Sequence, residues 1–303
     1  MLCVQIPKII KSDFTNNQCL ELRTIPQFFY LYFLMPVHFA TPSKTLAPYV
    51  KRYWAIENVL DKGEICIQRI IPTGLPELLL YFTSRPKILT DSKYLSDNVA
   101  LYGHQNDFYD MELIGNLSVF SIVFQPQGLM QFFNFPLNEI FNRNVSLKDI
   151  NGQAGRDLEE KMNEAITFQQ RVSVVETYLF NLLKNNFANF EFRRINHISE
   201  LIKQTYGNIS INQMVSEACL SRKQFERIFS ENIGISPKQY LKIIRFQSAI
   251  FLKQQNNTLN MTELSYESGY FDQSHFINDF KSLCGLTPKQ YFAENEVCSD
   301  FFE

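Results

Sequence analysis

Between residues 48 and 125, short apolar runs alternate with polar breaks along the chain. The runs are rich in β-branched and aromatic side chains, and Pro, Gly, Asp and Ser separate them. Such runs are typical of β-strands, and several of them at short spacing predict a small β-barrel or sandwich. The predicted strands are VKRYWAIEN (50–58), EICIQRII (64–71), ELLLYF (77–82), VALYG (99–103) and LSVFSIVF (117–124).

After Gly128 the spacing of the apolar positions changes to that of helices. GLMQFFN and PLNEIFN predict short helices, whereas 155–166 and 170–183 predict longer amphipathic helices that pack on the sheet or form an oligomer contact. The polar stretch 185–191 is interpreted as a hinge. The apolar stripe that follows, 193–206, predicts a helix that covers the next unit of the chain.

The segment 210–292 contains one pattern twice. GISPKQY (234–240) matches GLTPKQY (285–291) at an offset of 51, and the same offset aligns Phe225 with Phe276. Earlier in the two copies the offset is 50, so the second copy has one extra residue between its helices. Because insertions are tolerated in turns, each copy is predicted to be a helix, a short turn and a second helix.

Capping residues mark the ends of these predicted helices. Ser-x-x-Gln and Asn-x-x-Glu patterns open the first helices, and Ser or Asp opens the second ones. Glycine follows each second helix, and Ser-Pro or Thr-Pro opens the next helix. Two small helices with a tight turn and a polar outer face describe a helix-turn-helix unit. The capping positions are Ser210, Asn260, Ser221, Asp272, Gly234, Gly285, Ser236 and Thr287.

The two copies together resemble the DNA-binding domain of the AraC/XylS transcription regulators. In that family a first unit is followed by a linker helix with R-x-x-x-A and a second unit with G-[FY]-x-D-x-S-x-F. Here the linker has Arg245-x-x-x-Ala249, and the second unit reads GYFDQSHF over 269–276, followed by Gly285-x-Thr287-Pro288. The resemblance covers about the last 110 residues. It implies binding of promoter DNA through two recognition helices in successive major grooves, and activation through contact with RNA polymerase.

The polar faces of the two second helices supply the candidate DNA-reading side chains. Arginine can pair with guanine, glutamate with cytosine, and glutamine or asparagine with adenine, while isoleucine can contact the thymine methyl group. Asn278 stands where the family usually has arginine, and a merely solvated face is the alternative for all of these side chains. The resemblance implies Arg222, Lys223, Glu226 and Arg227 in the first helix, and Gln273, Ser274, His275, Ile277, Asn278 and Lys281 in the second.

The N-terminal half is similar, less specifically, to sensor-type domains that precede AraC-like modules. The similarity rests on PYVKRYW, IIPTGLPELLLYF and GHQ, and it implies a domain that binds a small-molecule effector or forms a homodimer. An effector pocket needs a few polar groups among apolar walls. A role in the core and in turns remains open for the same residues. The candidate pocket residues are Trp54, Arg69, Glu77, Tyr102 and His104.

The charges are distributed unevenly along an ordinary globular composition. The net charge of −2 would by itself argue against a nucleic-acid-binding protein. However, residues 221–253 have seven basic and two acidic side chains, a net charge of +5, whereas residues 254–303 have two basic and eight acidic ones, a net charge of −6. Since phosphate neutralisation dominates DNA affinity, we expect the first unit and the linker to supply most of the binding free energy, and the second unit to add mainly specificity.

Several classes of protein are not supported by the sequence. The six cysteines form no CxxC pattern and no metal-binding spacing with histidine, which is typical of reduced thiols. The longest apolar run, 28–37, is too short to cross a bilayer and lacks the features of a signal peptide. Neither a Gly-rich phosphate loop nor a nucleophile elbow is present. We therefore expect a cytoplasmic protein without a cofactor, metal site, membrane association or enzymatic activity.

The predicted organisation has three parts. Residues 1–40 form an N-terminal extension, of which 1–34 is hypothesised to lie upstream of the domain core because Met35 is an alternative start. An effector-binding or dimerisation domain covers 41–186, and a tandem helix-turn-helix domain covers 190–296. The fold class is multidomain α+β. The N-terminal domain is mixed α/β, with a small β-barrel or sandwich plus helices, and the C-terminal domain is all-α, with two helix-turn-helix units and a linker helix.

The predicted function is sequence-specific transcription regulation. One alternative is a DNA-binding module fused to an enzyme, which would need a reactive cysteine in a recognisable site, and a second is a purely protein-binding regulator. The residues leave the operator, the effector, the sign of regulation and the oligomeric state open.

Overall fold

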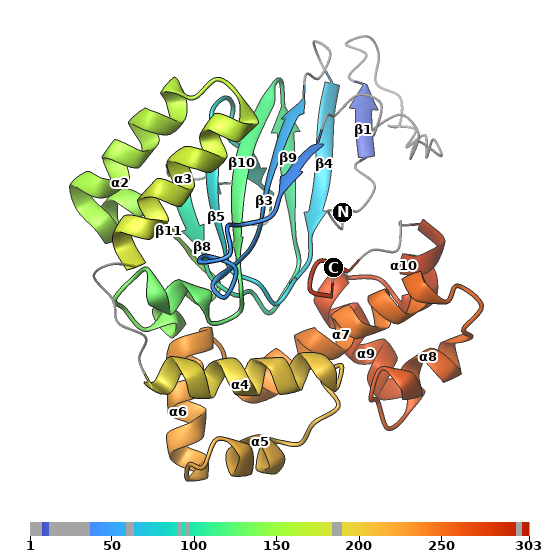
Figure 1. The fold of residues 1–303 in the computed structure, drawn as a ribbon. Helices are drawn as coiled ribbons and strands as arrows, with labels where there is room; N and C mark the ends of the chain where they lie inside the picture. Colours follow the sequence, from blue (N-terminus) through green and yellow to red (C-terminus); the bar gives the residue numbers. More distant parts are fainter. Residues whose placement is uncertain are drawn as a thin grey trace.

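A β-rich N-terminal domain is followed by a helical C-terminal domain, and the two lie against each other (Figure 1). The computed structural model describes residues 8–11, 37–58, 64–89, 93–94, 97–183, 190–294 and 299–302. The predicted fold class is confirmed, because strands are confined to the N-terminal domain and the C-terminal domain is built from helices in the part described.

Two antiparallel sheets build the N-terminal domain. The smaller sheet has the order β1 (Lys8–Lys11), β4 (Glu64–Ile70), β9 (Tyr109–Ile114), β6 (Lys87–Ile88) and β7 (Lys93–Tyr94). The larger sheet has the order β11 (Asn144–Ser146), β8 (Val99–Tyr102), β5 (Glu77–Tyr81), β10 (Leu117–Phe124), β3 (Val50–Asn58) and β2 (Val37–Ala40).

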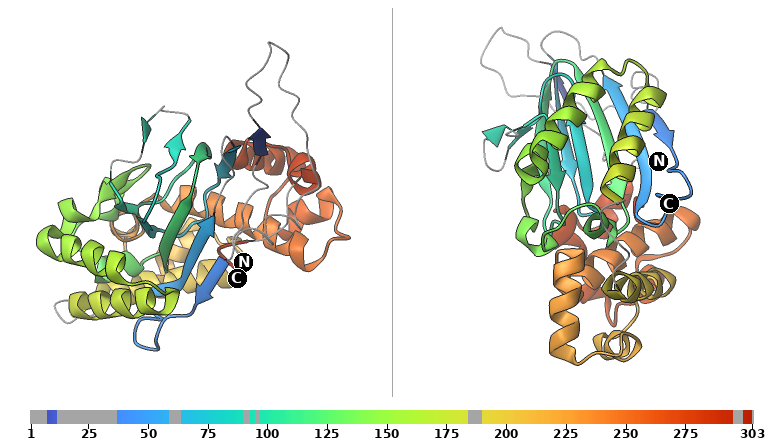
Figure 2. Two further views of the ribbon diagram at one scale, coloured as in Figure 1. Left: turned by 90° about the horizontal axis from the view of Figure 1, so that it is seen from above. Right: turned by 60° about the vertical axis from the view of Figure 1, so that its left-hand side comes forward.

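The larger sheet has two different faces. Ser121 of β10 lies opposite Trp54 of β3 and opposite Leu79 of β5, so these three side chains share the face that looks toward the smaller sheet. The other face packs against the helices α2 (Leu147–Glu164) and α3 (Phe168–Leu183), which lie beside each other over it in Figure 2. The sheet side chains of this second core include Tyr53, Leu78, Leu80, Phe120, Ile122 and Phe124, all almost fully buried.

The predicted elements of this domain are largely present. All five predicted strands occur within one residue of their predicted ends, and the short helices are the 3-10 turns η1 (Gly128–Gln131) and η2 (Leu137–Ile140). The helix predicted from residue 155 is the second part of α2, which bends at Asn151 and Gly152. Strand β9 was not predicted, because Asp110 and Glu112 interrupt its apolar residues.

Helices α4 to α10 form the C-terminal domain. The first helix-turn-helix unit is α5–α6 and the second is α8–α9, with α7 between them, as predicted. Helix α7 has 19 residues, which corresponds to about 28 Å at 1.5 Å per residue. The bounds are α4 (Phe190–Gln204), α5 (Ile211–Glu217), α6 (Arg222–Ile233), α7 (Pro237–Gln255), α8 (Met261–Glu267), α9 (Gln273–Cys284) and α10 (Pro288–Glu294).

The predicted caps explain where these helices begin and end. Capping boxes open α5, α6, α7 and α8, and the Asp272 carboxylate accepts a hydrogen bond from the backbone N–H of His275 at 2.8 Å at the start of α9. Gly234 and Gly285 end α6 and α9 with φ of 101° and 77°, in the left-handed region that favours glycine. The local sequence therefore determines the helix boundaries of both units.

The core of the C-terminal domain is aromatic and repeats with the units. The aligned Phe225 and Phe276 are fully buried, and Phe280 packs edge-on against Phe246 of α7, with ring centroids 4.7 Å apart. Aromatic pairs of this geometry stabilise a core beyond their buried area. Helix α7 is therefore the shared core element of both units.

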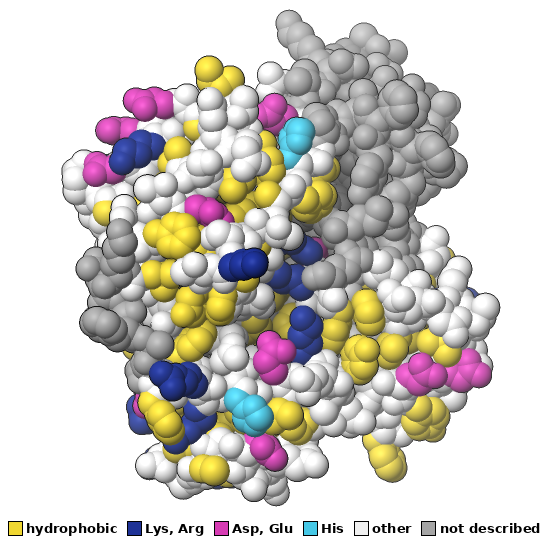
Figure 3. Space-filling model, viewed as in Figure 1, with side chains coloured by type: hydrophobic (Ala, Val, Ile, Leu, Met, Phe, Trp, Pro, Cys, Tyr) yellow, Lys and Arg dark blue, Asp and Glu magenta, His cyan; other side chains and the backbone are white. Residues whose placement is uncertain are grey.

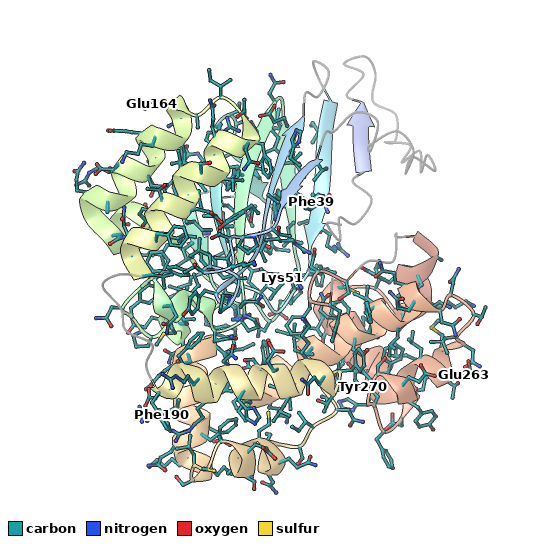
Figure 4. All side chains as sticks on the ribbon, viewed as in Figure 1. Phe39, Lys51, Glu164, Phe190, Glu263 and Tyr270 are labelled. Carbon is teal, nitrogen blue, oxygen red and sulfur yellow. The ribbon has the colours of Figure 1, made fainter. Side chains whose placement is uncertain are left out.

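Contacts between the two domains include those of α7 and of the C-terminal residues 299–302, as well as the packing of α6 on η2. The Gln247 side chain donates a buried hydrogen bond to the Pro72 carbonyl at 2.8 Å. Arg52 forms an ion pair with Asp300 at 2.5 Å. Lys51, labelled at the domain junction in Figure 4, donates to the Phe301 carbonyl at 2.6 Å. A charged and hydrogen-bonded contact therefore fixes the end of the chain to the N-terminal domain.

Parts of the predicted organisation lie outside the described residues. Of the proposed 1–34 extension only β1 is described, and it pairs with β4; β2 pairs with β3. Most of the predicted hinge lies in the gap at 184–189. Within the described chain, no helix has the length and hydropathy needed to cross a membrane.

Candidate nucleic-acid interface and cavity of the N-terminal domain

The first recognition helix, α6, separates its buried and exposed faces cleanly. Phe225 and Phe229 are fully buried against the rest of the unit. The predicted DNA-reading residues lie on the opposite side: Arg222, Lys223 and Arg227 are exposed and Glu226 is partly exposed. The structure therefore brings these four side chains together on one surface of α6.

Two of the three basic side chains of α6 form ion pairs with acidic side chains of the same helix. Arg222 contacts Glu226 at 3.0 Å, and Arg227 contacts both carboxylate oxygens of Glu231 at 2.9 and 3.0 Å. Exposed pairs one helical turn apart contribute less than about 1 kcal/mol to stability. Phosphate or guanine can therefore compete for these side chains at small energetic cost.

The second recognition helix, α9, presents a surface of mostly uncharged polar side chains. Phe276 and Phe280 are buried, and Ile277 is half-buried between the two faces. The remaining predicted residues, Gln273, Ser274, His275, Asn278 and Lys281, are exposed. Amide and hydroxyl groups can read base edges, but they neutralise no phosphate charge.

An acidic side chain on α9 contacts a lysine and a histidine near this surface. Asp279 contacts Nε2 of His275 at 3.3 Å and Nζ of Lys242, from the linker helix, at 3.4 Å. Reasoning from the sequence missed this bridge, although the spacing of His275 and Asp279, four residues apart on one helix, would have indicated half of it. Arg245 of the linker lies over the ring of Tyr270, with Cζ 5.3 Å from the centroid.

The two units differ in net charge, which is +5 over residues 221–253 and −6 over residues 254–303. Figure 3 shows Lys and Arg side chains toward the first unit and the domain junction, with some Asp, Glu and His side chains among them. It also shows Asp and Glu side chains over the second unit, where Figure 4 labels Glu263.

A cavity of about 190 Å³ lies between the two sheets of the N-terminal domain. Strands β3, β4, β5, β8, β9 and β10 contribute to its walls, together with the segment after β4 and Asp300 from the end of the chain. All five residues selected as pocket candidates, Trp54, Arg69, Glu77, Tyr102 and His104, line this single cavity. Asp300 was not anticipated from the sequence.

Burial changes the protonation of two lining groups. Desolvation, followed by the nearby Asp300 carboxylate, raises the pKa of Glu77 to about 7, although a hydrogen bond from Ser121 opposes the shift. Desolvation lowers the pKa of His104 to about 4, so its imidazole is neutral near pH 7. The cavity therefore holds an acid that titrates near neutrality and an uncharged histidine.

Two lining residues also contact the C-terminal domain. Arg69 binds both Asp110 oxygens at 2.7 and 2.8 Å and donates to the Cys284 carbonyl, at the end of α9, at 3.2 Å. The His104 ring packs edge-on against Tyr240 of α7, with centroids 5.8 Å apart. The cavity wall is therefore in direct contact with the linker and with the second recognition helix.

The described residues contain no group of three or more His, Cys, Asp or Glu side chains placed to hold a metal ion. Cys219 is exposed in the turn of the first unit, and Cys284 is buried, where desolvation raises the pKa of its thiol to about 12. A thiol with a raised pKa is a poor nucleophile near neutrality.

Comparison with protein families identifies two regions. Residues 38–146 match a domain of unknown function (DUF6597), and residues 214–294 match a helix-turn-helix domain. The crystal structure of ToxT from Vibrio cholerae O395 aligns over 81% of this chain and 99% of that chain, with a TM-score of 0.45 and 16% identity.

Curated relatives share the C-terminal region. An uncharacterised HTH-type transcriptional regulator of Haemophilus influenzae is 36% identical over 91 residues, 30% of each chain. The HTH-type transcriptional regulator MtrA of Neisseria gonorrhoeae is 31% identical over 114 residues, 37% of each chain. The chain thus spans about a third of the length of these relatives. The duplicated helix-turn-helix motif, the matched domain and the regulators that share it identify the C-terminal region of the chain as an AraC-type helix-turn-helix domain.

Proposed function

We propose that the protein is a sequence-specific transcription regulator that binds promoter DNA through α6 and α9. The observation that carries this proposal is the pair of helix-turn-helix units on one linker helix, each with a buried aromatic stripe and an exposed polar face. Recognition helices enter the major groove, and sites on one face of B-DNA recur every turn, about 34 Å. A linker of about 28 Å suits two helices in successive grooves, so one chain can contact two half-sites without dimerising.

The two helices have different roles in this proposal. Arg222, Lys223 and Arg227 bind phosphates and guanine, and Glu226 accepts from cytosine. On α9, Gln273 and Asn278 read adenine, Ile277 contacts a thymine methyl group, and the neighbouring polar side chains support that contact.

The N-terminal domain regulates DNA binding in this proposal, with the cavity as the site of a small-molecule effector. The contacts that support this role are those of Arg69 with the end of α9 and of His104 with α7. A ligand that moves either side chain would shift the balance between two arrangements of the domains. At the promoter, the regulator acts through contact with RNA polymerase, and a homodimer formed through the N-terminal domain would strengthen binding to paired sites.

Selection of bound sequences from random double-stranded DNA, followed by footprinting with the full chain, tests the proposal. We expect a bipartite protected site with two elements about one helical turn apart. Lys223→Ala/Arg227→Ala should weaken binding, whereas the matched charge control Arg156→Ala/Lys161→Ala on exposed positions of α2 should not. Absence of any salt-sensitive DNA binding would contradict the proposal and favour a purely protein-binding regulator.

A further inference from the structure

Three buried polar atoms that line the cavity between the sheets have no hydrogen-bond partner among the described residues: Nε1 of Trp54, the hydroxyl of Tyr102 and Nε2 of His104. The Glu77 carboxylate accepts a hydrogen bond from the Ser121 hydroxyl at 2.9 Å, and the described residues offer it no direct ion-pair partner. His104 donates from its ring to the Pro126 carbonyl, while its Nε2 is buried and has no partner in the described part of the chain. In this neutral tautomer Nε2 is an acceptor. A ligand with N–H donors would satisfy both groups.

The arginines beside the cavity are already paired. Arg69 binds Asp110 through two hydrogen bonds and stacks on Phe108, with Cζ 4.4 Å from the ring centroid. Arg52 binds Asp300 at 2.5 Å. Because bidentate and buried pairs of this kind are costly to break, a carboxylate or phosphate ligand would have to compete with Asp110 and Asp300 for these guanidinium groups, of whose buried nitrogens only Nε of Arg52 is without a partner in the described residues. This arrangement disfavours an anionic ligand.

Aromatic side chains surround the acidic group. Glu77 of β5 lies directly opposite Tyr102 of β8, so their side chains share the cavity face. Trp54, Tyr81 and Tyr109 line the same cavity. The face of an aromatic ring attracts a cation, and the aliphatic remainder of the wall suits an apolar body.

We propose that this cavity binds a small organic ammonium ion that has at least one N–H donor and an apolar or aromatic body. The ammonium group lies against Glu77 and His104, and the body packs against Trp54 and the aliphatic wall. This inference rests on the proposed function, because it takes the cavity as the effector site.

Through the C-terminal segment, binding of such a ligand can affect the DNA-binding domain. Asp300, which follows the second unit in sequence, lines the cavity and is held there by Arg52. An ammonium ion beside Glu77 reduces the repulsion between the Glu77 and Asp300 carboxylates. We therefore expect the bound ion to tighten the contact between the chain end and the N-terminal domain.

The experiment uses the single tryptophan of the chain, which lies in the cavity wall. The full-length protein is titrated without DNA, and the fluorescence of Trp54 is followed at about pH 8, where aliphatic amines are protonated. Two matched series are used: 2-phenylethylammonium, 2-phenylethanol and 3-phenylpropionate, and hexylammonium, hexanol and hexanoate. We expect the ammonium member of at least one series to bind about tenfold to a hundredfold more tightly than its neutral and anionic partners.

The variant Glu77→Gln keeps the size of the side chain and an acceptor for Ser121 but removes the charge. It should weaken ammonium binding by about tenfold or more and leave the alcohol unchanged. Glu164→Gln, at an exposed position of α2 labelled in Figure 4, is the matched control and should change neither affinity. If Glu77→Gln fails to fold by thermal unfolding, Tyr109→Leu replaces it and should weaken the ammonium more than the alcohol.

Equal binding of the ammonium, neutral and anionic members in both series, or full ammonium affinity in the folded cavity variant, would overturn the inference. DNA binding is measured on the same preparations. Salt-sensitive DNA binding without ammonium preference would defeat this inference alone. Ammonium binding without salt-sensitive DNA binding would defeat the proposed regulator instead.

Discussion

The two helix-turn-helix units have matching cores and opposite surfaces. Phe225 and Phe276 occupy equivalent, fully buried positions, and both units begin with capping boxes and end with a left-handed glycine. The surface of the first recognition helix has three cations, whereas that of the second has amides and hydroxyls beside a single lysine. Folding therefore constrains one face of each unit, and the other face is available for a separate function.

The turns of the two units both contain a residue with a positive φ, but the residue type differs. Gly269 in the second unit has φ of 78°, and Cys219 in the equivalent position of the first unit has φ of 51°. Glycine adopts this conformation without a steric penalty, whereas a side chain with Cβ is strained there. The second turn is thus locally less strained, although its unit has the weaker electrostatic attraction for DNA.

The largest expected effect is a loss of stability, which tests whether the cores of the two helix-turn-helix units are equivalent. Phe225→Ala and Phe276→Ala should each lower the free energy of unfolding by about 3–5 kcal/mol, because each removes a fully buried ring. Urea unfolding of the full chain measures both. A loss for one variant and none for the other would contradict the structural equivalence of the two units.

Removal of a recognition arginine should have a smaller, position-specific effect. Arg227→Ala should weaken binding to the selected DNA site by about 1–3 kcal/mol and relax the preference at one base position. Its ion pair with Glu231 is exposed, so the stability of the fold should change little. Titrations against the selected site and its single-base variants measure the effect, and an unchanged preference would exclude Arg227 from base recognition.

A change at Glu231, the ion-pair partner of Arg227, should affect DNA affinity in the opposite direction. Glu231→Gln releases Arg227 from its ion pair and removes one negative charge from the DNA-facing helix. Binding should therefore tighten, by less than about 1 kcal/mol. Weaker binding would indicate that Glu231 positions Arg227 for recognition.

The smallest expected effect lies in the turns. Cys219→Gly should raise the free energy of unfolding by up to about 1 kcal/mol, because glycine relieves the left-handed strain. Gly269→Ala should lower it, since the added Cβ would lie 3.0 Å from the Cβ of Asn208 at a positive φ. Thermal unfolding of both variants measures the difference, and changes of the same sign would refute the strain argument.

Local signals in the sequence predicted most of the helices and five of the strands that the structure describes, but not β1, β2, β6, β7, β9 and β11. The capping residues, the duplicated phenylalanines and the period of apolar positions can all be read from short stretches of sequence, so strands such as β10 and helices such as α3 were predicted closely. Strand β9 was missed because its pairing with β4, and not its own composition, stabilises it.

The candidate sites were predictable only in part. The five pocket residues were selected from the sequence and line one cavity. Asp300 could not be associated with Arg52, because 248 residues separate them. The pairing of Arg69 with Asp110 and that of Lys242 with Asp279 likewise depend on how distant elements pack.

The most direct test of the account compares the salt dependence of DNA binding for the two recognition helices. Lys223→Ala/Arg227→Ala removes two cations from α6, and Gln273→Ala/Asn278→Ala removes two amides from α9. The slope of log affinity against log salt should become shallower by about 1–2 for the first variant, at roughly 0.9 per phosphate contact, and stay nearly constant for the second. Affinity at low salt should fall more for the first. Equal flattening by both variants would contradict the claim that the first unit supplies the electrostatic attraction for DNA.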